Sequence, residues 1–223
     1  MKTTIIQFIP TKNYHQNLDK LITYIKNSTS KLIIAPEVIV TDFDYQNWQK
    51  ANEFANNIKQ TILELSKNKI IVFTLIEDNK NKAYVFYNQK VVYVREKIKL
   101  FSYEKKYFQK GEIEPEIFEI DGVKFAILIC FEIRFIEYWI KLKGVDVVLI
   151  PAMWGIERKN HLLTLSNALA LSLQSYVVVS DGLAFSSGII SPWGEEERNK
   201  NEVLNTDIYL KYIKKIRKRL PLE

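Results

Sequence analysis

The chain has 223 residues, of which 47% are hydrophobic and 26% charged, with one cysteine and a formal net charge of +6. This apolar content excludes an intrinsically disordered or low-complexity chain, and one cysteine cannot form an internal disulfide. The apolar runs are too short to cross a bilayer, so the sequence predicts one cytoplasmic domain over residues 1–223 without a membrane span.

The first half of the chain alternates between apolar runs rich in β-branched residues and segments with helical periodicity. Strands are expected at residues 3–9, 31–37 and 70–76. Apolar residues recur three and four positions apart at residues 18–25 and 48–65, which predicts an amphipathic helix between each pair of strands. The order is therefore strand, helix, strand, helix, strand.

The second half continues this alternation after a predicted β-hairpin at residues 83–94, whose turn is "NQK". A polar, aromatic loop follows at residues 101–116. The later elements are expected to be strands at residues 125–130, 145–151, 175–181 and 188–191, with helices at residues 137–144 and 161–175. Continuous apolar strands separated by helices predict an α/β fold in which helices cover the outer faces of the sheets.

Three of the apolar runs end in a chemically functional side chain: Glu37, Lys97 and Cys130. Ligands of α/β proteins tend to bind beyond the carboxyl ends of strands, so these groups are expected to converge on one pocket. A nucleophilic thiol needs a base, which Glu37 can supply. The ammonium of Lys97 and the backbone amide of Phe131 can stabilise an oxyanion. Taken singly, a lone cysteine is also typical of an inert core residue, and the other two of solvated surface.

In this order and in their local motifs, the three residues resemble the nitrilase superfamily of carbon–nitrogen hydrolases. The matching stretches are "LIIAPE", "EKIKLF" and "LICFEIRF", flanked by "VDVVLIPAMWG" and "SSGIISPWGE". The resemblance covers nearly the whole chain. It implies a four-layer αββα sandwich of the nitrilase type, with no metal and no organic cofactor.

The resemblance also implies roles for individual residues. Glu37 is the expected general base, Cys130 the nucleophile, and Lys97 the group that stabilises the tetrahedral intermediate. Glu104 corresponds to an additional active-site carboxylate of the family.

Further residues are assigned from their position in the sequence. Glu132 and Arg134 are expected to brace the turn that begins at Phe131. Met153, Trp154 and Phe185 are candidate walls of the substrate pocket, although such side chains are also common in cores.

The expected activity is that of a cysteine amidase, which hydrolyses a small linear amide to a carboxylic acid and ammonia through a thioester. A nitrilase or an N-carbamoyl amine hydrolase with the same triad remains open. The resemblance further implies a homodimer or a higher homo-oligomer.

The net charge raises an alternative of another class. The segment Tyr209–Arg219, "YLKYIKKIRKR", carries much of the positive excess and is most simply a solvated helix face. It also fits an inactive hydrolase-like scaffold that binds nucleic acid or an acidic partner. Because Glu37, Lys97, Cys130 and Glu104 are all present, the sequence favours an enzyme acting on a small molecule over a nucleic-acid-binding protein.

Overall fold

The computed structural model describes residues 1–222 and contains two six-stranded sheets. The first sheet has the order β12-β1-β2-β3-β4-β5. Its strands are β1 (Lys2–Ile6), β2 (Leu32–Ile34), β3 (Ile70–Glu77), β4 (Lys80–Tyr87), β5 (Lys90–Glu96) and β12 (Val203–Asp207).

The second sheet has the order β11-β10-β9-β8-β7-β6. Its strands are β6 (Phe118–Ile120), β7 (Val123–Ile127), β8 (Val147–Ala152), β9 (Tyr176–Asp181), β10 (Gly188–Ile190) and β11 (Glu196–Arg198). In both sheets the central strands are parallel, β1 with β2 and β3, and β7 with β8 and β9, and the outer strands are antiparallel.

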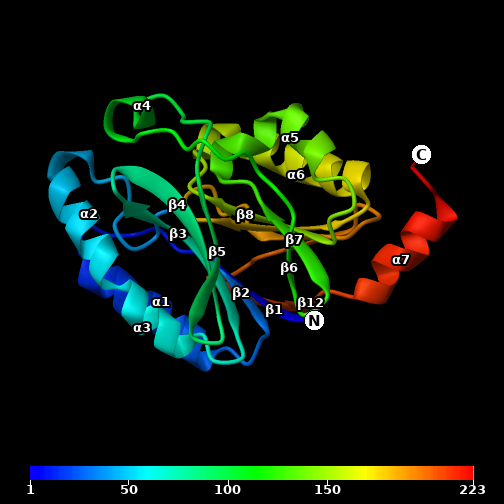
Figure 1. Ribbon diagram of the computed structural model, residues 1–223, viewed down its shortest axis with the longest axis horizontal. Coiled ribbons are helices and arrows are strands. Elements are labelled where there is room, and N and C mark those ends of the chain that lie inside the picture. The colour runs from blue at the N-terminus through cyan, green and yellow to red at the C-terminus, as the bar shows by residue number, and fades with distance from the viewer. Residues whose placement is uncertain (223) are drawn as a thin grey trace.

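Helices cover the outer face of each sheet (Figure 1). The first sheet is covered by α1 (Tyr14–Asn27), α2 (Trp48–Asn57) and α3 (Lys59–Leu65), and the second by α5 (Ile136–Lys141) and α6 (Lys159–Leu173). A short helix, α4 (Glu104–Tyr107), lies above one edge, and α7 (Leu210–Arg219) is the last helix of the described chain. Three 3-10 turns complete the helical elements: η1 (Tyr45–Asn47), η2 (Cys130–Arg134) and η3 (Ile156–Arg158). The predicted four-layer αββα sandwich is confirmed.

The alternation of side chains along a strand explains why these strands are apolar without interruption. In β2, Leu32 and Ile34 pack in the core that the two sheets share, whereas Ile33 packs in the core beneath α1 to α3. All three side chains are fully buried. A strand with helices on one face and a second sheet on the other has no face for polar residues, so its sequence reads as one hydrophobic run.

The predicted hairpin is confirmed as β4 and β5. Its turn residues Asn88 and Gln89 have φ angles of 49° and 61°, the left-handed geometry of a tight hairpin turn. Three strands were not predicted. Strand β6 is the short segment "FEI", which pairs antiparallel with β7 at the edge of the second sheet. Strand β12 pairs antiparallel with β1 through the mixed sequence "VLNTD", and β11 consists of the charged residues "EER". Both are edge strands with partly exposed side chains, so neither has a hydrophobic signal.

The basic segment near the C-terminus forms α7, which is attached to the core by its apolar face. Ile213 and Ile216 are buried, whereas most of the basic side chains lie on the outer face. The guanidinium of Arg217 contacts Asp146 at 3.4 Å and donates to the carbonyl oxygen of Val145. Within residues 1–222, no helix combines the length and the apolar character needed to span a membrane.

We expect Ile213→Ala to lower the free energy of unfolding by about 2–5 kcal/mol, because it removes buried atoms and leaves a cavity beneath α7. The matched control Lys214→Ala, on the exposed side of the same helix, should change it by less than about 0.5 kcal/mol. Urea denaturation measures both. Equal losses for the two variants would show that α7 is not attached through its apolar face.

Candidate active site

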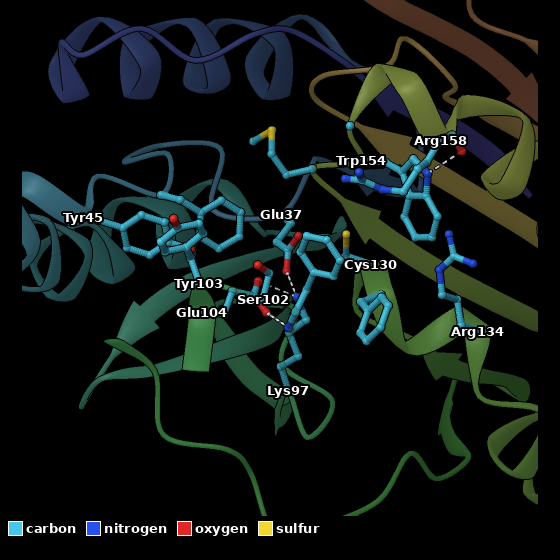
Figure 2. A pocket seen from close by; sticks show the side chains of 15 residues that line it. Glu37, Tyr45, Lys97, Ser102, Tyr103, Glu104, Cys130, Arg134, Trp154 and Arg158 are labelled. Atoms are coloured by element: carbon cyan, nitrogen blue, oxygen red, sulfur yellow. Dashed lines mark hydrogen bonds and ion pairs between the residues drawn. The ribbon is translucent and has the colours of Figure 1, made fainter. Parts of the chain in front are cut away.

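The three predicted triad residues lie together at one edge of the sandwich (Figure 2). Lys97 directly follows β5, whereas Glu37 and Cys130 each lie a short distance beyond β2 and β7. These strands run in the same direction within their sheets, because β5 is separated from the parallel strands by two antiparallel pairings. Their carboxyl ends therefore open at a common edge, as expected for an α/β site.

The ammonium of Lys97 is buried between two carboxylates. Its Nζ lies 2.7 Å from Oε1 of Glu37 and 2.7 Å from Oε1 of Glu104, and the three side chains are almost completely inaccessible to solvent. Burial acts to lower the pKa of Lys97, but the two carboxylates more than offset this, and the pKa is raised. Lys97 therefore carries a positive charge over the whole physiological pH range.

Asn81, on β4, connects Glu37 with Lys97. Its side-chain Nδ2 donates to Oε1 of Glu37 at 2.8 Å, and its carbonyl oxygen accepts the backbone N–H of Lys97 at 2.8 Å. Together with Nζ of Lys97, this amide gives Oε1 of Glu37 two hydrogen-bond donors. The other oxygen, Oε2, is buried and has no hydrogen-bond partner among the described residues. A buried carboxylate oxygen without a donor is costly, so this atom is available to accept a proton during a reaction.

Glu104 is the first residue of α4 and is held by the loop that precedes it. Its Oε2 accepts the backbone N–H of Phe101 at 2.6 Å, while its Oε1 contacts Lys97. Burial raises the pKa of Glu104, although Lys97 acts in the opposite direction. Two carboxylates beside one ammonium leave the group with one excess negative charge when all three are ionised, and this favours proton uptake by a carboxylate.

Cys130 does not lie at the end of the strand, as the sequence predicted, but beyond it. Strand β7 ends at Ile127, and Cys130 is the first residue of η2. Its φ angle of 47° is left-handed, and its side chain is 8% exposed. Burial raises the pKa of the thiol well above its usual value, and the Glu37 carboxylate adds to this, although Lys97 and a hydrogen bond from the backbone of Met153 oppose it. The thiol is therefore neutral at physiological pH.

Left-handed backbone recurs in the segments that carry the site. Val38, directly after Glu37, has a φ angle of 41°, and Ser102, in the loop before Glu104, has 39°. For a residue with a Cβ atom this conformation is unfavourable, and for β-branched valine it is rare. Together with Cys130, these are three strained positions in or next to the segments that carry the triad. The packing of the surrounding structure therefore holds a backbone conformation that these segments would not adopt on their own.

Glu132 braces the turn that carries Cys130 through a buried ion pair. Its carboxylate accepts from Nη1 and Nη2 of Arg95 at 2.5 and 2.9 Å, and also from the backbone N–H groups of Ile98 and Ile129, each at 2.8 Å. This links η2 with the segment that leads to Lys97. Both charged side chains are buried.

Arg134 is placed differently from the prediction. Its guanidinium lies at the pocket wall, where it contacts Nδ1 of His161 at 2.8 Å and stacks on Trp154. Among the described residues, its side chain contacts His161, Trp154 and Phe131 but no backbone group of the turn. We therefore assign the bracing contact to Glu132 and Arg95.

A cavity of about 230 Å³ opens above the triad. Cys130, Glu37, Lys97 and Glu104 line its base, and Met153 and Trp154 form part of its wall, as the sequence predicted. Phe185 is the exception. It lies in a separate surface hollow with Tyr24 and Glu202, and its side chain does not line the cavity. No group of three or more potential metal-binding side chains occurs in residues 1–222.

Several site residues had no signal in the sequence. Asn81 and Arg95 lie in charged, polar stretches of the β4–β5 hairpin, and Tyr45 and Arg158 lie in short 3-10 turns.

Asp181, by contrast, had a sequence signal that was not used: it ends the apolar run of β9, as Cys130 ends its own apolar run. Its carboxylate accepts backbone N–H groups of Trp154, Leu183, Ala184 and Ser186, and so fixes the loop that carries the Trp154 wall.

A buried thiol, a carboxylate and an ammonium that meet at the edge of an αββα sandwich are the chemical groups that suit a hydrolase. The chain belongs to the carbon–nitrogen hydrolase family, whose model matches residues 2–218. It is therefore a carbon–nitrogen hydrolase of the nitrilase superfamily.

Several relatives resemble the chain over nearly its whole length. It is 26% identical to a 2-oxoglutaramate amidase of Bacillus subtilis (93% of this chain and 90% of the relative) and 25% identical to an omega-amidase of Xenopus tropicalis (99% and 93%). It is also 27% identical to a nitrilase of Pyrococcus abyssi, covering 93% of this chain and 88% of the relative.

Solved structures confirm the fold. A CN-hydrolase superfamily protein from Xanthomonas campestris superposes with a TM-score of 0.86 at 18% identity, covering 99% of this chain and 95% of the other. Nit3 of Saccharomyces cerevisiae superposes with a TM-score of 0.85 at 19% identity, covering 100% and 94%.

We expect Glu132→Gln to lower the free energy of unfolding by about 3–5 kcal/mol, because it leaves the buried charge of Arg95 without its counter-ion. Arg134→Met should cost less than about 1 kcal/mol, since the pocket-wall guanidinium has no buried carboxylate partner to abandon. Urea denaturation followed by circular dichroism measures both. A larger loss for Arg134→Met would reverse the assignment of the bracing contact.

We also expect no thiolate signal from the folded enzyme between about pH 6 and pH 9, because burial raises the pKa of Cys130 above that of an ordinary thiol. The measurement is the difference in absorbance near 240 nm between the wild type and Cys130→Ala as pH increases. Unfolding in urea should restore a thiolate step near pH 8.5. A step at neutral pH in the folded enzyme would mean that the thiolate is already formed at rest.

Proposed function

We propose that the protein is a cysteine amidase that hydrolyses a small linear amide to a carboxylic acid and ammonia. The observation that carries this proposal is the free Oε2 of Glu37, buried beside a neutral thiol whose own pKa is too high for spontaneous ionisation. Figure 2 shows Cys130 next to Glu37 and Lys97, and all three line the cavity. A thiol of this kind becomes a nucleophile only as a base removes its proton.

In the first step, Oε2 of Glu37 accepts the thiol proton while Sγ of Cys130 bonds to the amide carbon. The electron pair of the carbonyl moves to oxygen. Two hydrogens of the Lys97 ammonium point to Glu37 and Glu104, and the third can donate to this oxyanion. The Phe131 amide, in the first turn of η2 where helical N–H groups lack intrahelical acceptors, is the second donor.

In the second step, protonated Glu37 transfers the proton to the amide nitrogen, the carbon–nitrogen bond breaks, and ammonia leaves a thioester on Cys130. Water then attacks the thioester carbon while Glu37 takes a proton from the water. When the carbon–sulfur bond breaks, sulfur regains that proton and the acid is released. The sum is one amide and one water converted to one acid and one ammonia, with the enzyme restored.

Glu104 and Asn81 serve as positioning residues in this scheme. Glu104 holds the ammonium of Lys97 from the side opposite Glu37, and Asn81 holds Oε1 of Glu37 so that Oε2 stays free. A group fixed by two partners needs no reorganisation when charge develops on the substrate, which is the main source of electrostatic catalysis.

The nitrilase alternative keeps some support, because a relative of similar identity is named a nitrilase. The same thiol can add to a nitrile carbon, so the base and the nucleophile are common to both reactions. No described contact supports the nucleic-acid-binding alternative. The basic helix α7 contributes no residue to the cavity.

Ammonia release from a panel of small primary amides tests the proposal. Cys130→Ala should reduce the rate to the uncatalysed level, because no covalent step remains. Lys97→Met should reduce turnover by about 10²–10³-fold or more, because it removes an oxyanion donor and leaves two carboxylates unpaired. The matched control Lys99→Met, two positions along on a partly exposed side chain, should change the rate by less than about threefold. Full activity in Cys130→Ala would rule the mechanism out.

A further inference from the structure

The outer face of α7 carries a row of positive charges. Four exposed lysines recur three and four positions apart along the helix: Lys211, Lys214, Lys215 and Lys218. This spacing places them on one face, which we call the lysine face. The opposite face contains Ile213 and Ile216, which are buried against the body of the protein. The lysine face therefore points away from the core.

The protein supplies no counter-charge for the lysine face. None of its four lysines has a carboxylate within ion-pair distance among residues 1–222. Two acidic residues contact α7 on its flanks. Asp146 lies 3.4 Å from Arg217, and Glu195 accepts from the hydroxyl of Tyr212 at 3.3 Å. Like charges four positions apart repel each other, so this row destabilises the helix unless a negatively charged partner covers it.

Exposed apolar side chains adjoin the lysine face. Leu220 and Leu222, which follow α7, are 52% and 44% exposed, and Trp193 is 42% exposed. Trp193 and Leu220 line one surface hollow of about 220 Å³ together with Leu171 of α6. The guanidinium carbon of Arg219, the last residue of α7, lies 5.1 Å from the ring centroid of Trp193 and connects this hollow with the basic helix. One surface thus combines cations with exposed aliphatic and aromatic groups.

This combination fits a membrane surface better than a nucleic acid. Anionic lipid headgroups attract lysines, and the boundary between headgroups and acyl chains accepts leucine and tryptophan side chains. Phosphate recognition in nucleic acids favours the planar fork of arginine, whereas the lysine face contains only lysines, which act as point charges. Nucleic-acid binding by charge also gives no role to Leu220 and Leu222.

We propose that the lysine face of α7, with Trp193, Leu220 and Leu222, binds the surface of a membrane that contains anionic lipids. The helix stays packed on the protein while the apolar side chains beside it enter the headgroup region. In Figure 1, α7 lies at one end of the molecule and α4, whose Glu104 lines the active-site cavity, lies towards the other. Binding through α7 therefore leaves the cavity open to small substrates.

Co-sedimentation with lipid vesicles tests the proposal. Phosphatidylcholine vesicles are compared with mixed phosphatidylcholine and phosphatidylserine vesicles, and the partition coefficient of the protein is measured. The wild type should bind the mixed vesicles far more tightly, and less so as salt screens the charges. Changing the four lysines of the lysine face to glutamine should lower the partition coefficient by about 100- to 1000-fold, because each lysine contributes roughly fivefold. Equal binding to both kinds of vesicle, or binding to neither, would overturn the proposal.

A matched control separates the lysine face from the net charge. It removes the same charge by changing to glutamine four exposed lysines elsewhere on the surface: Lys26, Lys67, Lys90 and Lys143. This control should change the partition coefficient by less than about threefold, since salt screens charges that lie far from the bound membrane. Circular dichroism verifies that both variants are folded. Equal losses in the two variants would show that no particular face binds, and would overturn the proposal.

Trp193 distinguishes a bilayer from other polyanions. Brominated lipids quench a tryptophan that enters the bilayer, and Trp193 is exposed whereas Trp139 and Trp154 are buried. Quenching should occur in the wild type and be lost in Trp193→Phe. Changing Leu220 and Leu222 to glutamine should lower vesicle binding by about tenfold. Fluorescence that brominated vesicles leave unchanged, with tight binding to a DNA duplex that the leucine changes do not affect, would assign α7 to a nucleic acid and overturn the proposal.

Discussion

The active edge of this protein depends on one buried ammonium held between two carboxylates. Lys97 lies 2.7 Å from both Glu37 and Glu104, in a region without solvent. Removing a charge from water costs several kcal/mol, and only close counter-charges offset that cost. The arrangement keeps Lys97 charged and holds Oε1 of Glu37, whereas Oε2 has no hydrogen-bond donor among the described residues and lies near a neutral thiol. The charge pattern of the site thus requires that all three side chains be present together.

The sandwich supplies the rigidity that this arrangement needs. Strands from both sheets end at the same edge, and left-handed backbone at Val38, Ser102 and Cys130 directs the chain into the cavity. Each such residue costs of order 1–3 kcal/mol, which the packing around it must offset. The ion pair of Glu132 with Arg95 joins the Cys130 turn to the segment before Lys97. The turn that carries Cys130 and the segment that leads to Lys97 are therefore fixed by the same buried contact.

The sequence was sufficient for the layers and for the position of the triad. Uninterrupted apolar runs such as residues 31–34 indicate strands buried on both faces, and a functional side chain beyond such a run indicates a site. The sequence was insufficient to predict features that depend on contacts between distant segments of the chain. Asn81 and Arg158 lie in polar stretches and meet the triad only through folding, β12 pairs with β1 from nearly 200 residues away, and the left-handed turn at Cys130 has no local sequence signature. Phe185 was assigned to the pocket from its residue type alone, and that type does not specify which hollow it lines.

We propose that Cys130 forms a thioester with the acyl group of the substrate, and partitioning of that intermediate tests this proposal most directly. Amides that share an acyl group but release different amines are incubated with the enzyme at a fixed hydroxylamine concentration, and the ratio of acid to hydroxamate is measured. A common thioester predicts the same ratio for every leaving amine, and no product from Cys130→Ala. A ratio that changes with the amine, or hydroxamate formed without Cys130, would contradict a thioester on Cys130.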